Sequence, residues 1–194
     1  MRSRGRPPLS RGVLSLEDRF VPCPEQIVLD TSFVVEALLS SQPRHRSCQE
    51  YLVRLAEAGT TFYFNRLLEL ELEETSFLIA LKERHPKNWR RYRYDGRVRP
   101  RASRLMDEVH DAWQDILDAV PWRCVEVHEI IGAVPALMAD HGLSSYDAVH
   151  AASAIESGVG AIVTLDVGFA SVPERALCLY VDASRVTRCR QIRS

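Results

Sequence analysis

The amino-acid sequence predicts an α/β fold in which helices cover both faces of a central parallel sheet of about five strands. Short apolar segments alternate along the chain with longer segments of helical spacing, and the short segments are hydrophobic at nearly every position. A strand with one face in water would instead alternate apolar and polar residues. The pattern is therefore typical of a three-layer α/β/α sandwich.

The first third of the chain contains two strand-helix units. The apolar run 26–29 suits a strand and is followed by apolar residues at helical spacing over 33–38. A second helix over 46–58 stops at Gly59. The β-branched and aromatic run 60–64 then suits a buried strand.

Two long helices follow, separated by a basic segment. The first is expected over 67–81 and the second over 103–120, where Pro121 ends it. A third strand is expected over 123–127.

The last part of the chain repeats the alternation. Helices are expected over 129–141 and 146–157, and each is closed by a glycine. Apolar strands are expected over 161–165 and 177–181.

These elements define one domain over residues 26–182, with a basic insertion at about 85–104 and a short C-terminal tail over 183–194. A chain of 194 residues is long enough for one ordinary domain with a sizeable core. Residues 1–25 are expected to form a flexible basic tail, or to reflect a wrongly assigned start. Their arginines are not followed by an apolar core, which excludes a secretory signal.

Composition favours a soluble protein of the cytoplasm. Hydrophobic residues make up 46% of the chain and charged residues 26%, as in globular proteins. No apolar run approaches the roughly 20 residues that a membrane-spanning helix needs. The five cysteines are scattered, without a Cys-x-x-Cys pair, and so favour a reducing compartment over disulfides or zinc.

Charge is distributed unevenly. Residues 82–104 contain ten Lys or Arg and two acidic residues, so this segment carries about +8 in a chain whose net charge is −1. A basic segment on an acidic body suggests nucleic acid at one place and cations at another.

Two acidic residues directly follow expected strands. Asp30 ends the first strand and Asp166 ends the strand over 161–165. Carboxyl ends of parallel strands are where ligands bind in open α/β sheets. Each residue alone could equally begin a turn or cap a helix. Thr164 places a hydroxyl two residues before Asp166, on the same face of the strand end.

Asp147 lies in the first turn of an expected helix. Ser144 can cap that helix, and an acid there favours the helix dipole, so structure alone could explain Asp147. The alanine-rich face of this helix would let it approach the sheet closely and bring Asp147 to the strand ends. His150 shares the face of Asp147 and is expected to be packed or hydrogen bonded rather than a ligand.

A fourth acid is expected from the helix after the second strand. Its leucines face inward and leave its glutamates on different sides, so apolar spacing does not choose among them. The candidates are Glu69, Glu71, Glu73 and Glu74.

Taken together, these motifs are similar to the motif series of PIN-domain proteins. The motifs are Leu29-Asp-Thr-Ser, an acidic helix after the second strand, Leu-Ser-x-Tyr-Asp-Ala-x-His-Ala-Ala, and Thr164-x-Asp-x-x-Phe169. Their order and spacing match as a set over residues 26–182. The resemblance points to the bacterial and archaeal branch that includes toxins of toxin-antitoxin pairs.

The resemblance implies an endoribonuclease that hydrolyses RNA phosphodiester bonds with one or two Mg²⁺ or Mn²⁺ ions. Family members usually place the helix glutamate six residues after a small polar residue that ends the second strand. Counting from Asn65 gives Glu71, with Glu74 as the second choice. Ser32 and Thr164 match positions that support the metal or phosphate. The implied catalytic and metal-binding quartet is Asp30, Glu71, Asp147 and Asp166.

The resemblance also implies partners, namely an RNA substrate, a second copy in a homodimer and a small antitoxin, with no membrane. The long N-terminal tail and the basic insertion depart from compact family members and leave substrate and partner open.

Metal-dependent hydrolysis suits a cluster of four carboxylates. Carboxylates brought close together repel one another, which raises their pKa values unless a cation binds. Mg²⁺ prefers oxygen ligands, and two such ions can activate a water and stabilise the leaving oxygen.

The basic insertion interleaves arginines with aromatic residues, and we hypothesise that it guides RNA to the acids. Arginines meet phosphates, and aromatic rings stack on unpaired bases. A solvated flexible loop, or one that pairs with an acidic partner, is an equal alternative. The candidate RNA-binding residues are Trp89, Arg90, Arg91, Tyr92 and Arg93.

Two other functions fit part of the sequence. A phosphatase with Asp30 as nucleophile would need a second acid two residues on, where Ser32 stands. A PIN-like module that binds RNA or protein without catalysis is the main alternative. Stabilisation by Mn²⁺ distinguishes it from a metal-dependent nuclease.

Overall fold

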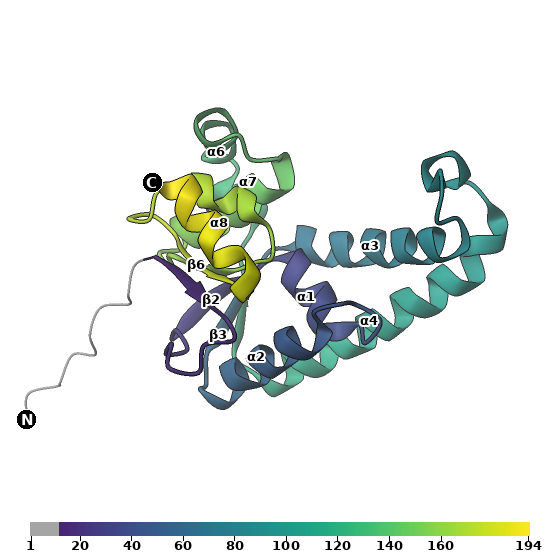
Figure 1. Ribbon diagram of the computed structural model, residues 1–194, viewed down its shortest axis with the longest axis horizontal. Helices are drawn as coiled ribbons and strands as arrows, with labels where there is room; N and C mark the ends of the chain where they lie inside the picture. The colour runs from purple at the N-terminus through teal and green to yellow at the C-terminus, as the bar shows by residue number, and fades with distance from the viewer. Residues whose placement is uncertain (1–11) are drawn as a thin grey trace, which may run out of the picture.

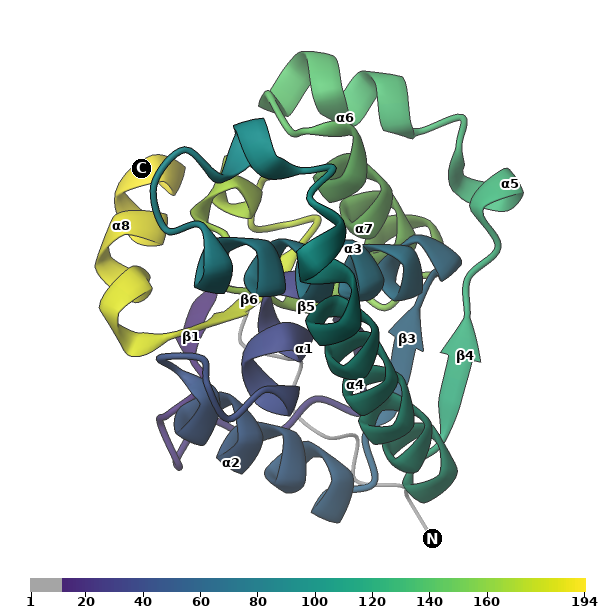
Figure 2. The same cartoon turned by 90° about the vertical axis from the view of Figure 1, so that its right-hand side faces the viewer.

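The central layer of the protein is one six-stranded parallel sheet in the order β1-β6-β5-β2-β3-β4 (Figures 1 and 2). The computed structural model describes residues 12–194. The predicted parallel α/β class is confirmed, and each of the five predicted strands is present. The strands are β1 (Val13–Ser15), β2 (Gln26–Leu29), β3 (Thr61–Phe64), β4 (Trp122–Cys124), β5 (Ala161–Val163) and β6 (Cys178–Val181).

Helices cover both faces of this sheet. Figures 1 and 2 place α6 and α7 on one side, and α1, α2 and α4 on the other. Within residues 12–194 no helix is both long and apolar enough to span a bilayer. The helices are α1 (Thr31–Leu38), α2 (His45–Glu57), α3 (Arg66–Arg84), α4 (Arg99–Ala119), α5 (Val127–Ile130), α6 (Val134–His141), α7 (Ser145–Glu156) and α8 (Ala183–Arg193), and the 3-10 turns are η1 (Trp89–Tyr92), η2 (Gly96–Val98) and η3 (Val167–Ser171).

The strand order reverses between β2 and β5. From β2 the chain moves outward through β3 to β4, and it later returns to β5 and moves the other way to β6. Leu29 pairs with Val163, and the Asp30 N–H donates to the Val163 carbonyl over 3.1 Å. Asp30 and Thr164 therefore leave the sheet next to one another, at the edge where open α/β sheets bind ligands.

Helices α3 and α4 pack against each other and project from the body as an arm (Figure 1). The far end of the arm has a small core of its own, against which Trp89 packs. The His85 ring stacks on Tyr92 with centroids 4.0 Å apart. The basic insertion is thus an ordered tip. Its core residues are Ala80, Leu81, Val98 and Ala102.

Both segments that are expected as tails contain secondary structure. Residues 13–15 form edge strand β1, because Val13 and Leu16 are buried and the segment pairs with β6. Residues 183–193 form α8, which Asp182 caps and Cys189 anchors in the core. The remainder of the expected N-terminal tail, residues 1–11, lies outside the described residues.

The helix expected over 129–141 is divided into α5 and α6. Residues 131–133 interrupt it, and Pro135 lies in the first turn of α6. Proline has no N–H to donate, so it is tolerated in a first turn but not within a continuous helix. The single helix expected over 129–141 is therefore two helices in the structure.

Candidate metal and nuclease site

Asp30 is buried where β2 ends, with 4% of its surface exposed. Its Oδ2 accepts hydrogen bonds from the hydroxyls of Ser32 and Thr164, the latter over 2.8 Å. The Ser32 Oγ also accepts the Leu165 N–H over 2.9 Å. These two hydroxyls fix one oxygen of Asp30 and tie the end of β2 to the end of β5.

Asp166 follows β5 and is exposed. Its N–H donates to Thr164 Oγ1 over 2.9 Å, so one hydroxyl links the positions of Asp166 and Asp30. Its Oδ1 accepts the Gly168 N–H over 2.7 Å, which caps η3. The side chain is thereby held at the carboxyl edge.

Glu71 lies on α3, two turns after Asn65 caps that helix. Its Oε2 accepts a hydrogen bond from Thr31 Oγ1 over 2.6 Å and lies 2.7 Å from His150 Nε2. Thr31 follows Asp30 directly, and His150 comes from α7. Three elements therefore meet at Glu71.

His150 is oriented by Asn65. The Asn65 Oδ1 accepts the Leu67 N–H over 3.0 Å, which leaves the amide nitrogen facing His150 Nδ1 at 3.2 Å and Ser153 Oγ at 3.0 Å. The Nδ1 atom is then an acceptor, and Nε2 carries the hydrogen donated to Glu71. This matches the expectation of a buried, hydrogen-bonded histidine.

Asp147 lies in the first turn of α7, as expected. The Ser144 hydroxyl accepts the Asp147 N–H over 3.2 Å and donates to Asp147 Oδ2 over 2.6 Å. A capping interaction thus fixes one oxygen of the side chain. Alanines on the buried face of α7 let the helix pack against β2, β3 and β5.

The side chains interact electrostatically across these elements. Burial raises the pKa of the Asp30 carboxyl, more than His150 and the two hydroxyls lower it, and the Asp147 charge adds to the rise. Burial alone would lower the pKa of His150, but its bond to Glu71 and the charges of Asp30, Glu71 and Asp147 raise it. The charges of three acids of the predicted quartet therefore act on one histidine.

The donor set suits a hard divalent cation. In each of the four acids one oxygen is held by the bonds described above, and the other accepts no hydrogen bond from residues 12–194. Oxygen donors of this kind are what Mg²⁺ and Mn²⁺ prefer. Within the same residues no three Asp, Glu, His or Cys side chains lie close enough together to enclose an ion. The four acids are therefore of the chemical type that binds such a metal, and they lie at the same edge of the sheet. They are spaced more widely than the ligands of a site that encloses an ion.

The second-choice acid, Glu74, lies elsewhere. Its Oε1 pairs with Arg93 Nη2 over 2.8 Å, toward the arm tip. Glu71 contacts Thr31 and His150 instead, which favours Glu71 for the quartet.

The candidate RNA-binding residues all lie at the arm tip, but they differ in availability. Trp89 packs on the small core beneath Arg90, whose guanidinium lies 4.6 Å from the ring centroid. Arg93 is paired with Glu74, whereas Arg90 and Arg91 make no ion pair with the described residues. The helical rise of 1.5 Å places the tip about 20 Å beyond Glu71. Tyr94, another aromatic residue of the insertion, is 91% exposed.

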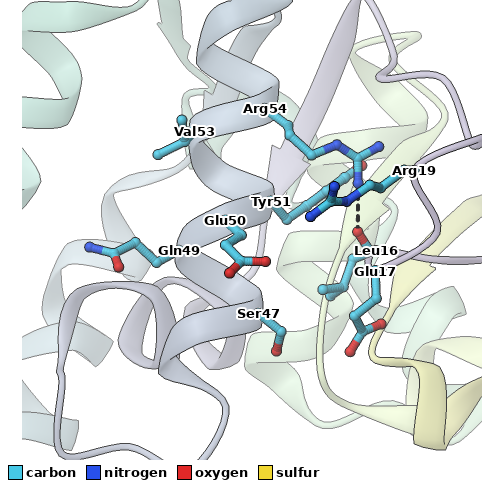
Figure 3. A pocket seen from close by; sticks show the side chains of 9 residues that line it. All are labelled: Leu16, Glu17, Arg19, Ser47, Gln49, Glu50, Tyr51, Val53 and Arg54. Atoms are coloured by element: carbon cyan, nitrogen blue, oxygen red, sulfur yellow. Dashed lines mark hydrogen bonds between the residues drawn. The ribbon is translucent and has the colours of Figure 1, made fainter.

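Two of the hollows near the sheet differ in chemistry. One of about 300 Å³ adjoins the acids and includes Ser32 and Asp166 in its wall. A larger one of about 550 Å³ lies against α2, where Arg54 donates to the Leu16 carbonyl over 3.0 Å (Figure 3). None of the predicted acids lines the larger hollow, so the smaller one marks the candidate site.

Comparisons with known proteins agree with this fold. A family model of the PIN domain matches residues 27–175. A chain in the crystal structure of VapBC2 from Rickettsia felis bound to a DNA fragment from their promoter is similar over 80% of this chain and 98% of that chain. Sequence identity is 15% and the TM-score is 0.50, so this similarity concerns the fold alone. No curated protein matches the sequence.

Proposed function

The chain belongs to the PIN-domain family, and from this premise we propose that it is a Mg²⁺- or Mn²⁺-dependent endoribonuclease. The observation that carries the proposal is the placement of four acids at one sheet edge, each with one oxygen held and the other free of hydrogen bonds from residues 12–194. The proposed catalytic and metal-binding residues are Asp30, Glu71, Asp147 and Asp166.

The surrounding residues hold these acids in place. Ser32 and Thr164 fix Asp30, Thr31 and His150 fix Glu71, and Ser144 fixes Asp147. The bound ions would supply an activated water and stabilise the leaving oxygen of the RNA phosphodiester. Preorganised carboxylates reduce the rearrangement needed to receive the ions.

We further propose that the protein is the toxin of a toxin-antitoxin pair, forms a homodimer and meets a small antitoxin. The similar fold of a VapBC2 chain, from a toxin-antitoxin complex, supports this assignment. All five cysteines are free thiols, as suits the reducing cytoplasm that we propose as its location.

The test is cleavage of a mixed pool of single-stranded RNA with Mn²⁺, with Mg²⁺ and with chelator. Cleavage is expected only with metal, and Asp147→Asn is expected to reduce it about 100-fold or more. Glu74→Gln is the matched control, because it removes an acid of α3 that pairs with Arg93 at the tip. At saturating RNA it should cleave like the wild type, because affinity gained from the released Arg93 does not then affect the rate.

Two results would contradict the proposal. Cleavage that continues in chelator, or in Asp147→Asn, would exclude this metal site as its source. No cleavage together with no melting-temperature response to Mn²⁺ would favour the non-catalytic binding module.

The arm tip is proposed to guide RNA, and its arginines should contribute unequally. Removing Arg90 and Arg91 together should weaken RNA binding several-fold and lower the slope of log affinity against log salt by about 1.4. Arg93→Ala should have a smaller effect, because Glu74 already neutralises that side chain. Affinity for single-stranded RNA, measured at several salt concentrations in chelator, distinguishes these outcomes. Unchanged affinity and slope in the double variant would remove the guidance hypothesis.

A further inference from the structure

A hollow whose lining includes two arginines adjoins the acids on the side of β5 and β6. It measures about 300 Å³, and Ser32, Leu165 and Asp166 form the wall nearest the acids. The other wall carries two arginines, one from the segment between α1 and α2 and one from α8. The lining residues are Ser32, Glu36, Arg44, Leu165, Asp166 and Arg185.

Arg44 is held in position from two directions. The side-chain Nε lies 3.2 Å from Asp182 Oδ2, and the backbone N–H donates to Glu36 Oε2 over 2.6 Å. The terminal guanidinium nitrogens make no hydrogen bond with residues 12–194. The side chain is 32% exposed, so these nitrogens can meet a ligand in the hollow.

Arg185 is placed by the same aspartate. Asp182 caps α8 by accepting the Ser184 N–H over 2.9 Å, and its carbonyl accepts the Arg185 N–H over 2.8 Å. The Arg185 side chain is half-buried and makes no hydrogen bond or ion pair with the part of the chain that the structure describes. Asp182 thus sets the positions of two cationic groups in one hollow.

The guanidinium groups of the hollow can bind an anion. One oxygen of each acid in the lining is held by a backbone N–H, that of Glu36 by Arg44 and that of Asp166 by Gly168. A guanidinium presents a planar array of donors that matches a phosphate, often with two parallel hydrogen bonds. The hollow offers two such groups, those of Arg44 and Arg185, to a phosphate.

We propose that Arg44 and Arg185 bind an RNA backbone phosphate adjacent to the one that is cleaved. This inference rests on the proposed nuclease function. Asp166 lines both the hollow and the acid site, so a strand lying across the acids passes the two arginines. Arg185 lies beyond residues 27–175, so this contact belongs to the C-terminal segment that follows the family match.

The experiment measures binding of a single-stranded RNA to the full chain in chelator, where metal-dependent cleavage is absent, at several salt concentrations. Arg185→Ala is expected to weaken binding about 3- to 10-fold and to lower the salt slope by about 0.7. Arg188→Ala is the matched control, because Arg188 is an exposed arginine one turn further along α8 and outside the hollow. Arg185→Lys should restore most of the salt slope, since a lysine keeps the charge.

The outcomes separate this inference from the nuclease proposal. A wild type that cleaves RNA with metal, beside an Arg185→Ala variant with wild-type affinity and slope, would overturn the inference alone. Equal losses in Arg185→Ala and Arg188→Ala would also overturn it, because the effect would then be one of overall charge. A wild type that neither binds nor cleaves RNA would overturn both.

Discussion

Replacing Asp30 with asparagine is expected to stabilise the metal-free protein while abolishing RNA cleavage. The carboxylate is buried, and burial together with the Asp147 charge disfavours its ionised form. Asparagine has nearly the same shape, and its carbonyl oxygen can accept the bonds from Ser32 and Thr164. The expected gain in chelator is on the order of 1 kcal/mol, which is a rise in Tm of about 2–4 °C.

The pH dependence of stability supplies a second measurement of the same effect. The raised pKa means that the unfolded chain releases the Asp30 proton at a lower pH than the folded chain. Stability from this group is therefore lost as the pH rises from the unfolded value to the raised folded value, and it stays low above that range. Asp30→Asn should lack this loss. The gain in stability of the variant over the wild type should therefore be greatest at neutral pH and small in acid.

Asp166→Asn is the control for Asp30→Asn. Its carboxylate is exposed and hydrated, so the substitution should leave the melting temperature in chelator nearly unchanged while still reducing cleavage. Adding Mn²⁺ should raise the melting temperature of the wild type and have much less effect on Asp30→Asn. An Asp30→Asn variant that melts below the wild type in chelator at neutral pH would show that the carboxylate stabilises the fold, contrary to this account.

The sequence was sufficient to predict the sheet and two strand-end acids. Strands buried on both faces are apolar throughout, so β2, β5 and β6 are visible as short hydrophobic runs. An acid directly after such a run must lie at the carboxyl edge, which places Asp30 and Asp166. Strand β1 is only three residues long, and only pairing with β6 distinguishes it from a loop.

The helix glutamate could not be chosen from apolar spacing, because the choice depends on contacts between distant segments. Glu69 pairs with Arg66 and contacts the Trp113 N–H, and Glu74 pairs with Arg93. Only Glu71 reaches Thr31 and His150, which are 40 and 79 residues away in the chain. The order of the arm tip likewise depends on packing between α3 and the segment that follows it. A run of arginines and aromatic residues does not reveal that packing.

His150→Ala is expected to damage both stability and metal binding. His150 is 1% exposed, and its ring connects Asn65 to Glu71. Removing the ring leaves a cavity and unpaired polar groups, at a cost of about 2–4 kcal/mol. The variant should also cleave RNA about 10- to 100-fold more slowly and bind Mn²⁺ more weakly, because Glu71 loses a partner that fixes its orientation.

Two further variants separate positioning of Glu71 from simple support of the fold. Ser153→Ala removes the other buried partner of the Asn65 amide, and Ser153 makes no contact with Glu71. It should cost about 1 kcal/mol and leave Mn²⁺ affinity unchanged. His150→Gln retains an N–H that can reach Glu71, so it should recover more Mn²⁺ affinity than stability. If His150→Ala lost stability alone, with the Mn²⁺ dependence of melting and of cleavage unchanged, the histidine would support the core and not the acid. A selective loss of Mn²⁺ affinity would instead show that His150 orients Glu71. His150 is itself oriented by Asn65, the residue that caps α3.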